Sequence, residues 1–190
     1  MNAVIDESGW HRGARALPSD NYNARPDGCV PGLVVVHNIS LPPGRFATGS
    51  IEALFCNHLD CSADPSFAGL EELRVSAHFL IDRAGGLTQF VSCNDRAWHA
   101  GVSAFAGRAN CNDFSIGIEL EGTDTTPFEA AQYDALSELL RVLRSRYATL
   151  RQAPIVGHSD IAPGRKTDPG PAFSWQRLRA ALRAVDQPLR

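Results

Sequence analysis

The chain has 190 residues, is 44% hydrophobic and carries a formal net charge of −3. This length and apolar content predict a single globular domain with a real core. No block of basic residues offers the footprint of a nucleic-acid binder, and no apolar stretch approaches the length of a membrane span. We therefore expect one domain over residues 1–190, with neither nucleic acid nor membrane as a partner.

The N-terminus and the cysteines both favour a cytoplasmic location. The first residues, MNAVIDES, are acidic and lack the apolar core of a signal peptide. The five cysteines are odd in number and form no C-x-x-C pair, which is atypical of a disulfide framework. Cys56 and Cys61 enclose His58 and Asp60, but this spacing fits no common structural zinc pattern, and we expect ordinary reduced thiols.

The first half of the chain is predicted to hold short strands between turn-rich segments. Residues 1–30 are rich in Asp, Asn, Arg and Pro and are expected to wrap the surface, with the catalytic core following over residues 31–185. Apolar or β-branched runs predict strands, and a Gly-rich segment between two of them predicts a hairpin connection. These predictions are strands at 33–37, 75–81 and 87–91, a short helix at 50–55 and the hairpin connection at 82–86.

The second half contains the clearest elements. Residues 115–121 alternate strictly, with isoleucine and leucine on one face and Ser, Gly and Glu on the other, which predicts a strand. The sequence TPFE at 126–129 fits a capping box with proline in the first turn, and leucines at helical spacing follow it. A short strand at 154–157 and a helix that bears Trp175, Leu178, Leu182 and Val185 on one face complete the chain. This order predicts an α/β domain with one central mixed sheet flanked by helices.

Two histidines stand at the ends of predicted strands. His37 closes an apolar run, and His158 follows a short apolar strand, at the positions where open α/β sheets tend to place their sites. Together with Asp168 they would supply two imidazoles and one carboxylate, a set that leaves a fourth zinc position for water. Spacing alone leaves open a satisfied histidine at a sheet edge, a simple turn role for Asp168, and competition from Asp160.

Three charged residues are candidates for the chemistry beside such a metal. Glu119 lies on the polar face of the alternating strand, where a carboxylate needs a partner or a function, and it could accept and return a proton. Lys166 could meet a developing negative charge. Glu121 shares the face of Glu119, so two alternatives stay open: the acid pair of a glycosidase, whose carboxyls lie ~5–9.5 Å apart, or the exposed face of an edge strand.

Four further side chains have both a functional and a structural interpretation. Trp98 is either a platform for a sugar or peptide or a buried core residue. Arg74 is either a bidentate clamp for a carboxylate or a solvated surface charge. His78 and His99 are flanked by apolar or aromatic residues, which favours structural or supporting roles over direct metal ligation.

Five segments, in this order along the chain, resemble a known family. They are 34–44 (VVVHNISLPPG), 73–78 (LRVSAH), 96–103 (RAWHAGVS), 111–124 (CNDFSIGIELEGTD) and 157–171 (GHSDIAPGRKTDPGP). On these motifs the chain is identified as a member of the zinc-dependent N-acetylmuramoyl-L-alanine amidases of the amidase-2 group. Within that group it closely resembles the cytosolic 1,6-anhydro-N-acetylmuramoyl-L-alanine amidases.

The resemblance implies the fold shared with peptidoglycan-recognition proteins and one Zn²⁺ per chain, held by His37, His158 and Asp168. It assigns proton transfer to Glu119 rather than Glu121, and places Lys166 where the oxyanion forms. The substrate cleft is implied to be lined by Asn38, Arg74, Trp98 and Arg165.

The implied reaction is hydrolysis of the amide that joins the lactyl group of N-acetyl-1,6-anhydromuramic acid to the L-alanine of the stem peptide. This reaction belongs to cytosolic peptidoglycan recycling, with a small anhydro-muropeptide as the partner, and we expect a monomer. One departure concerns substrate contacts: enzymes of this type can carry arginine just before Cys-Asn-Asp, where this chain has Asn110, with Arg108 two residues earlier.

Three rival functions follow from the same residues. A peptidoglycan-binding module would have lost zinc ligands, and all three are present here. A secreted autolysin would need an export signal or a wall-binding repeat, and neither is visible. A non-haem iron oxygenase also uses two histidines and a carboxylate, but it would leave Lys166 and Glu119 without a role.

Overall fold

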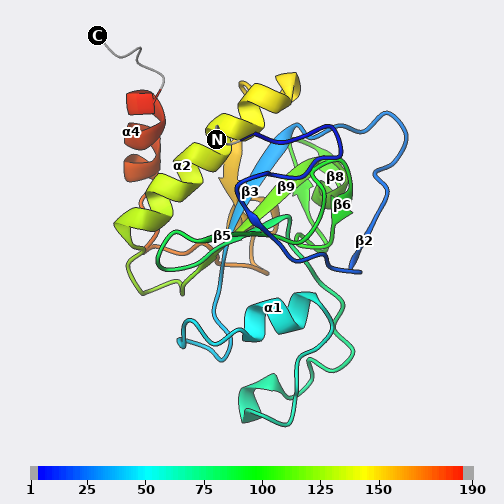
Figure 1. The fold of residues 1–190 in the computed structure, drawn as a ribbon, viewed down its shortest axis with the longest axis vertical. Helices are drawn as coiled ribbons and strands as arrows, with labels where there is room; N and C mark the ends of the chain where they lie inside the picture. Colours follow the sequence, from blue (N-terminus) through cyan, green and yellow to red (C-terminus); the bar gives the residue numbers. More distant parts are fainter. Residues whose placement is uncertain (1–3, 186–190) are drawn as a thin grey trace.

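A six-stranded mixed sheet forms the centre of the molecule, described here for residues 4–185 of a computed structural model (Figure 1). The strands run in the order β1, β5, β4, β9, β3, β10, and every neighbouring pair is parallel except β4 and β5. Their bounds are β1 Arg15–Ala16, β3 Leu33–Ile39, β4 Phe79–Ile81, β5 Leu87–Gln89, β9 Ser115–Glu121 and β10 Ile155–Gly157. The predicted fold class is confirmed.

Helices pack on the sheet, and short 3₁₀ turns and two small two-stranded ribbons lie outside it. The long α2 and the C-terminal α4 lie side by side and contact each other, whereas the segment with α1 (cyan) lies away from them (Figure 1). No helix within the described range 4–185 is long and apolar enough to cross a bilayer. The α-helices are α1 Ser50–Phe55, α2 Ala130–Arg146, α3 His158–Ile161 and α4 Trp175–Val185, and the 3₁₀ turns are η1 Pro65–Phe67, η2 Cys111–Asp113 and η3 Ala148–Leu150. Two small ribbons pair β2 Tyr22–Asn23 with β6 Arg96–Ala97, and β7 Ala104–Phe105 with β8 Arg108–Ala109.

Strand β9 lies between β3 and β4 and is buried on both faces. One face packs its aliphatic side chains, all fully buried, against the leucines of α2. The other face, which carries Ser115, Gly117, Glu119 and Glu121, is buried as well. The alternative of an exposed edge-strand face is therefore wrong: β9 has a parallel neighbour on each side, and all seven of its residues are buried.

Several predicted boundaries differ from the structure: β3 extends to residue 39, β5 ends at residue 89 and β10 begins at residue 155. Two further differences have a clear physical cause. The strand predicted at 75–81 is limited to 79–81, because the N–H of Ser76 donates to the Trp98 carbonyl rather than to a sheet neighbour. Helix α2 begins at Ala130 with Glu129 as its N-cap, so the predicted capping box at 126–129 is one turn too early. The Glu129 N–H donates to the side-chain oxygen of Gln132 (3.0 Å), which makes the reciprocal contact that TPFE was expected to make.

Candidate metal centre and active site

Three predicted metal ligands meet at the carboxyl ends of the parallel strands. His37 lies on β3, and His158 follows β10, which pairs directly with β3. The Nδ1 atoms of the two histidines are 3.0 Å apart, and each lies 3.1 Å from Oδ2 of Asp168. Within residues 4–185 this is the only group of three or more potential ligand residues that converges in this way.

The triangle has the chemistry and the size of a zinc shell. The Nε2 atom of His158 lies 3.0 Å from the Ala100 carbonyl oxygen, which can only accept, so Nε2 carries the hydrogen and Nδ1 presents a lone pair. Zinc bonds of ~2.0–2.1 Å in tetrahedral geometry would hold such ligand atoms ~3.3 Å apart. Without a cation, unprotonated donor atoms gathered this closely would repel one another. The residues present therefore fit a zinc ion.

The protonation states of His37 and Asp168 are those that a metal ligand requires. Burial is the main cause that lowers the pKa of His37 to about 4, so the imidazole is neutral at physiological pH. Burial works to raise the pKa of Asp168, but its close contacts with His158 and His37 outweigh burial and hold that pKa below its ordinary value. A neutral imidazole and an ionised carboxylate are the states that bind a metal.

Glu119 lies beside the triangle with one carboxylate oxygen free. It pairs in register with His37 across β9 and β3, and it is 8% exposed. Its Oε2 atom is buried without a hydrogen-bond partner. Burial, followed by the negative charge of Asp168, raises the pKa of Glu119 well above its ordinary value, and Lys166 opposes the shift. A carboxylate with a raised pKa and a vacant acceptor is suited to take up a proton.

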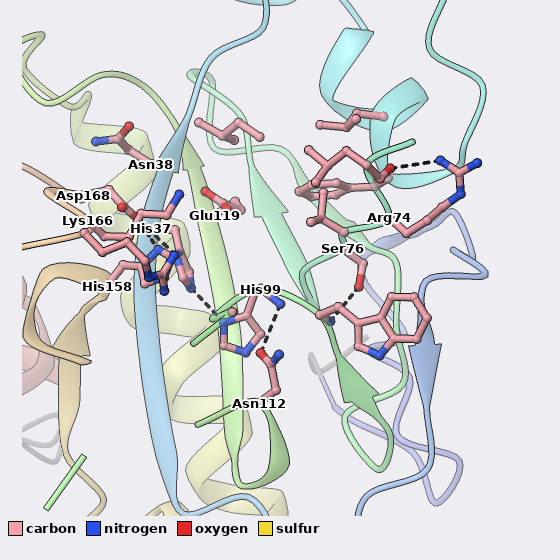
Figure 2. Close-up of a pocket in the computed structure, with 18 residues that line it drawn as sticks. His37, Asn38, Arg74, Ser76, His99, Asn112, Glu119, His158, Lys166 and Asp168 are labelled. Carbon is pink, nitrogen blue, oxygen red and sulfur yellow. Dashed lines mark hydrogen bonds and ion pairs between the residues drawn. The ribbon is translucent and has the colours of Figure 1, made fainter. Parts of the chain in front are cut away.

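A cleft of about 460 Å³ opens from this centre and contains every residue predicted for the site. In Figure 2 the three ligands and Lys166 gather at one end, with Arg74 and Ser76 toward the opposite end and Glu119 between them. The four residues predicted to contact substrate also line the cleft: Asn38, Arg74, Trp98 and Arg165.

These four side chains are held by their own contacts. Asn38 donates to Oδ1 of Asp124 (2.7 Å), and the indole N–H of Trp98 donates to Oδ1 of Asn23 (2.7 Å). Arg165 donates to the carbonyls of residues 100 and 102, so part of its guanidinium fixes a loop beside the metal ligands. Arg74 is exposed and donates only to the backbone carbonyls of residues 71 and 73.

Glu121 has a structural environment. Its carboxylate accepts hydrogen bonds from the N–H groups of Ala47 (2.6 Å) and Arg83 (3.3 Å), and it lines a separate cavity. Glu121 therefore ties two loops to the end of β9 and does not face the cleft of Glu119. The arrangement gives no support to a glycosidase acid pair.

The departure at Asn110 lies outside the described cleft lining. Asn110 has a positive φ of 58°, and asparagine is among the residues that tolerate this conformation. Arg108 stacks over the ring of Phe114 at 4.0 Å and contacts Cys29. Cys56 and Cys61 are free thiols that contact backbone carbonyls, in keeping with the expectation of reduced cysteines.

Three supporting residues were not identified from the sequence as candidates: Asn112, Ser115 and Asp124. Each acts through a hydrogen bond to a segment distant in sequence, and a single sequence carries no record of such pairing. The only available signal was their place inside the motif 111–124.

The comparisons with known proteins agree with this geometry. The Amidase_2 family model, described as N-acetylmuramoyl-L-alanine amidase, matches residues 27–171. The chain belongs to the amidase-2 family of N-acetylmuramoyl-L-alanine amidases. Among its relatives is the 1,6-anhydro-N-acetylmuramyl-L-alanine amidase AmpD of Escherichia coli K12, which is 56% identical over 179 residues, covering 94% of this chain and 97% of the relative.

Solved structures of such amidases are similar as well. The crystal structure of a selenomethionine AmpD derivative superposes with a TM-score of 0.91 at 53% identity, covering 94% of this chain and 99% of that one. The amidase AmiD of Escherichia coli, solved in complex with anhydro-N-acetylmuramic acid-L-Ala-D-γ-Glu-L-Lys, has a TM-score of 0.57 at 29% identity, covering 95% of this chain and 66% of that one. The family expected from the sequence motifs is confirmed.

Proposed function

We propose that this amidase is a zinc hydrolase that cleaves the bond between the lactyl group of N-acetyl-1,6-anhydromuramic acid and the L-alanine of the stem peptide. The observation that carries the proposal is the buried triangle of His37, His158 and Asp168 with the unpartnered Oε2 of Glu119 beside it. The relatives support the substrate, since AmpD is named for the anhydro sugar and AmiD was solved with an anhydro-muropeptide.

One Zn²⁺ per chain would be held by the three ligands. When bound, it would polarise the scissile carbonyl and acidify a water molecule at neutral pH. The two histidines contribute neutral nitrogens and Asp168 one negative charge, so the site with its ion keeps a net positive charge facing the cleft.

Glu119 acts as the proton carrier. Its free Oε2 accepts the proton of the attacking water as the oxygen adds to the amide carbon. The same carboxyl then delivers that proton to the departing nitrogen, so the C–N bond breaks with the amine as leaving group and the lactyl carboxylate as the second product. The raised pKa of Glu119 favours the first of these steps, because it makes the carboxylate a stronger base than an ordinary glutamate.

Lys166 stabilises the negative charge that develops on the carbonyl oxygen. Lys166 lies on the loop between α3 and Asp168 and lines the cleft. Its positive charge acts on both Glu119 and His37. A cation fixed beside the reacting carbonyl stabilises the transition state more than the neutral substrate.

Substrate binding is assigned to the remainder of the cleft. We assign the sugar or peptide platform to Trp98 and carboxylate recognition to Arg74, whose exposed guanidinium is bonded only to nearby carbonyls. Asn38 donates its amide N–H to Asp124, which leaves the Oδ1 acceptor for a substrate N–H. We propose cytosolic recycling of such soluble fragments as the setting.

Mass spectrometry of a purified anhydro-muropeptide incubated with the protein tests the proposal. We expect release of free stem peptide by the zinc-loaded protein and none after chelation. Glu119→Ala should lower kcat ~10²–10⁴-fold with zinc content unchanged, whereas Asp168→Ala should lose the zinc as well. Intact substrate with the zinc-loaded protein would contradict the proposal, and loss of zinc in Glu119→Ala would make Glu119 a ligand instead.

A further inference from the structure

The outer nitrogens of both metal-binding histidines are directed at two consecutive residues. Nε2 of His37 lies 2.9 Å from Nδ1 of His99, and Nε2 of His158 lies 3.0 Å from the carbonyl oxygen of Ala100. Ligand histidines bind a metal in one tautomer, and the partner of the outer nitrogen selects that tautomer. The segment at 99–100 therefore controls both histidines of the proposed metal centre.

We infer that His99 is a positioning residue that fixes His37 in its metal-binding tautomer through a directed chain of hydrogen bonds ending at the backbone. The inference rests on the proposed zinc site, and it assigns a role to a histidine that binds no metal itself. Figure 2 shows His99 between His37 and the labelled Asn112.

The last hydrogen bond of this series determines which atoms donate and which accept in the others. The hydroxyl of Ser115 donates to the carbonyl of Cys111 (2.6 Å), because that carbonyl oxygen can only accept. The Ser115 oxygen is then the acceptor for the Nε2–H of His99 (3.1 Å). A neutral imidazole with its hydrogen on Nε2 has a lone pair on Nδ1, and this lone pair accepts the Nε2–H of His37.

The packing of the ring favours this arrangement. Gly117 lies flat against the ring: a Cβ atom there would be only 2.4 Å from Cγ of His99. Only a glycine at residue 117 leaves room for the His99 ring against β9.

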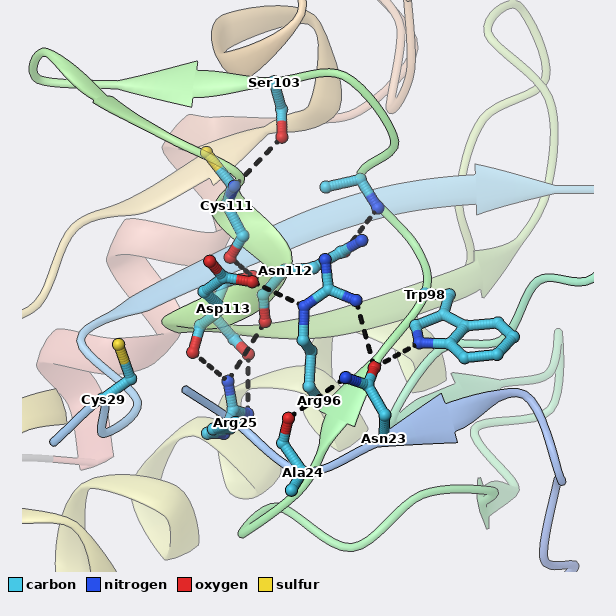
Figure 3. Close-up of polar contacts among 12 residues, drawn as sticks. Asn23, Ala24, Arg25, Cys29, Arg96, Trp98, Ser103, Cys111, Asn112 and Asp113 are labelled. Carbon is cyan, nitrogen blue, oxygen red and sulfur yellow. Dashed lines mark hydrogen bonds and ion pairs between the residues drawn. The ribbon is translucent and has the colours of Figure 1, made fainter. Parts of the chain in front are cut away.

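Asn112 holds the backbone of the same segment. Its side-chain oxygen accepts hydrogen bonds from the N–H groups of His99 (3.1 Å) and Ala100 (2.8 Å). One amide thus places both acceptors, the His99 ring and the Ala100 carbonyl. The turn η2 that carries Asn112 is itself fixed, since Arg96 donates to Asp113 (2.5 Å) and Arg25 donates to the carbonyls of residues 112 and 113 (Figure 3).

Loss of the His99 acceptor would release the other tautomer of His37. With the hydrogen on Nδ1, His37 would donate to Asp168, and the nitrogen facing the metal position would have no lone pair to offer. Removing an outer partner of a metal ligand typically lowers metal affinity ~10–100-fold. We expect a loss of this size for zinc.

The variants separate the acceptor from the shape of the side chain. His99→Phe keeps an aromatic ring and removes the acceptor, whereas His99→Asn can present an amide oxygen near the position of Nδ1. Ser115→Ala removes only the last link of the chain. His58→Phe, at an exposed histidine outside the cleft, is the matched control.

Two measurements test the inference. Zinc affinity is measured by competition with a chromogenic chelator, and the tautomer of His37 by long-range ¹H–¹⁵N correlation in the zinc-free protein. We expect His99→Phe to bind zinc ~10–100-fold more weakly and to move His37 toward the Nδ1–H form. His99→Asn should stay within about threefold of wild type, and Ser115→Ala should fall between them.

The outcomes distinguish this inference from the proposed function. Wild-type protein that binds no zinc at its triangle would overturn the proposed function, and the tautomer measurement would still decide the role of His99. Unchanged zinc affinity and an unchanged His37 tautomer in His99→Phe would overturn the inference alone. If that variant does not fold, Ser115→Ala with wild-type affinity and tautomer gives the same negative answer.

Discussion

At the scale of single residues, Glu119 combines burial with a carboxylate oxygen that has no partner. Buried polar atoms normally have hydrogen-bond partners, so an unpartnered oxygen beside a cleft indicates that the residue is kept for function. Strand alternation placed Glu119 on a polar face, and the sequence motif distinguished it from Glu121. The physical difference between them is visible only in the structure, where Glu121 has two backbone donors and Glu119 lacks a partner for Oε2.

Glu119→Gln should stabilise the zinc-free protein at neutral pH. Because the folded-state pKa of Glu119 is raised, the folded protein holds this proton more tightly than the unfolded chain, and stability is lost as pH rises from the ordinary value of 4.5 through the raised pKa. Glutamine is neutral and removes that loss. Thermal unfolding in chelator at pH 7 should show a higher Tm, by ~2–4 °C for each kcal/mol gained.

The same experiment at low pH tests whether the ionisation of Glu119 causes this difference. Well below pH 4.5 the Glu119 side chain is neutral in both the folded and the unfolded protein, and the gain from glutamine should vanish. Glu121→Gln is the matched control on the same strand face, where loss of a charged acceptor for two N–H groups should lower the Tm. A lower Tm for Glu119→Gln at pH 7 would contradict this account of the buried carboxylate.

At the scale of elements, β9 and α1 have the bounds that the sequence predicted, and α4 includes the four residues predicted for its apolar face. Their signals are local: strict alternation in β9 and an apolar helical face in α4. The position of β9 between β3 and β4 could not be predicted, because strand order depends on pairing between distant segments. The start of α2 was misplaced because a Thr-Pro pair and the Glu129–Gln132 pair both fit a helix start, and only packing at the end of the sheet distinguishes them.

Gln132→Ala should destabilise the protein markedly. The Gln132 side chain is fully buried, accepts from the Glu129 N–H and donates to the carbonyls of Glu121 (3.0 Å) and Ile81 (3.4 Å). Its removal leaves the N–H at the start of α2 and the carbonyls at the ends of β4 and β9 without these partners, which should lower the free energy of unfolding by ~1–3 kcal/mol. Urea unfolding should show a lower midpoint at unchanged slope. Thr126→Ala, at the start predicted from sequence, should cost much less, and equal losses would contradict the observed cap.

At the scale of the whole molecule, the proposed metal centre joins segments that are far apart in the chain. His37 is separated from Asp168 by most of the domain, yet the two side chains lie 3.1 Å apart. The sequence motifs predicted which residues would meet, and the parallel pairing of β3 with β10 accounts for the meeting of the histidines. The outer contacts at residues 99, 112 and 115 depend on loop geometry, which no local pattern encodes.

Zinc should therefore stabilise the entire fold. A ligand that binds only the folded state adds RT ln(1 + [L]/Kd), or ~2.7 kcal/mol at a free concentration of 100 Kd. Differential scanning fluorimetry should show a higher Tm with zinc than with chelator, and Asp168→Ala should remove most of that difference. An equal zinc-dependent shift in Asp168→Ala would mean that zinc binds elsewhere.

The most direct test of the metal centre is anomalous diffraction at the zinc edge from crystals of the zinc-loaded protein. We predict one strong anomalous peak per chain, bonded to Nδ1 of His37, Nδ1 of His158 and a carboxylate oxygen of Asp168, at ~2.0–2.2 Å. A zinc-loaded crystal with no peak between these three side chains, or with its peak at other ligands, would contradict the account.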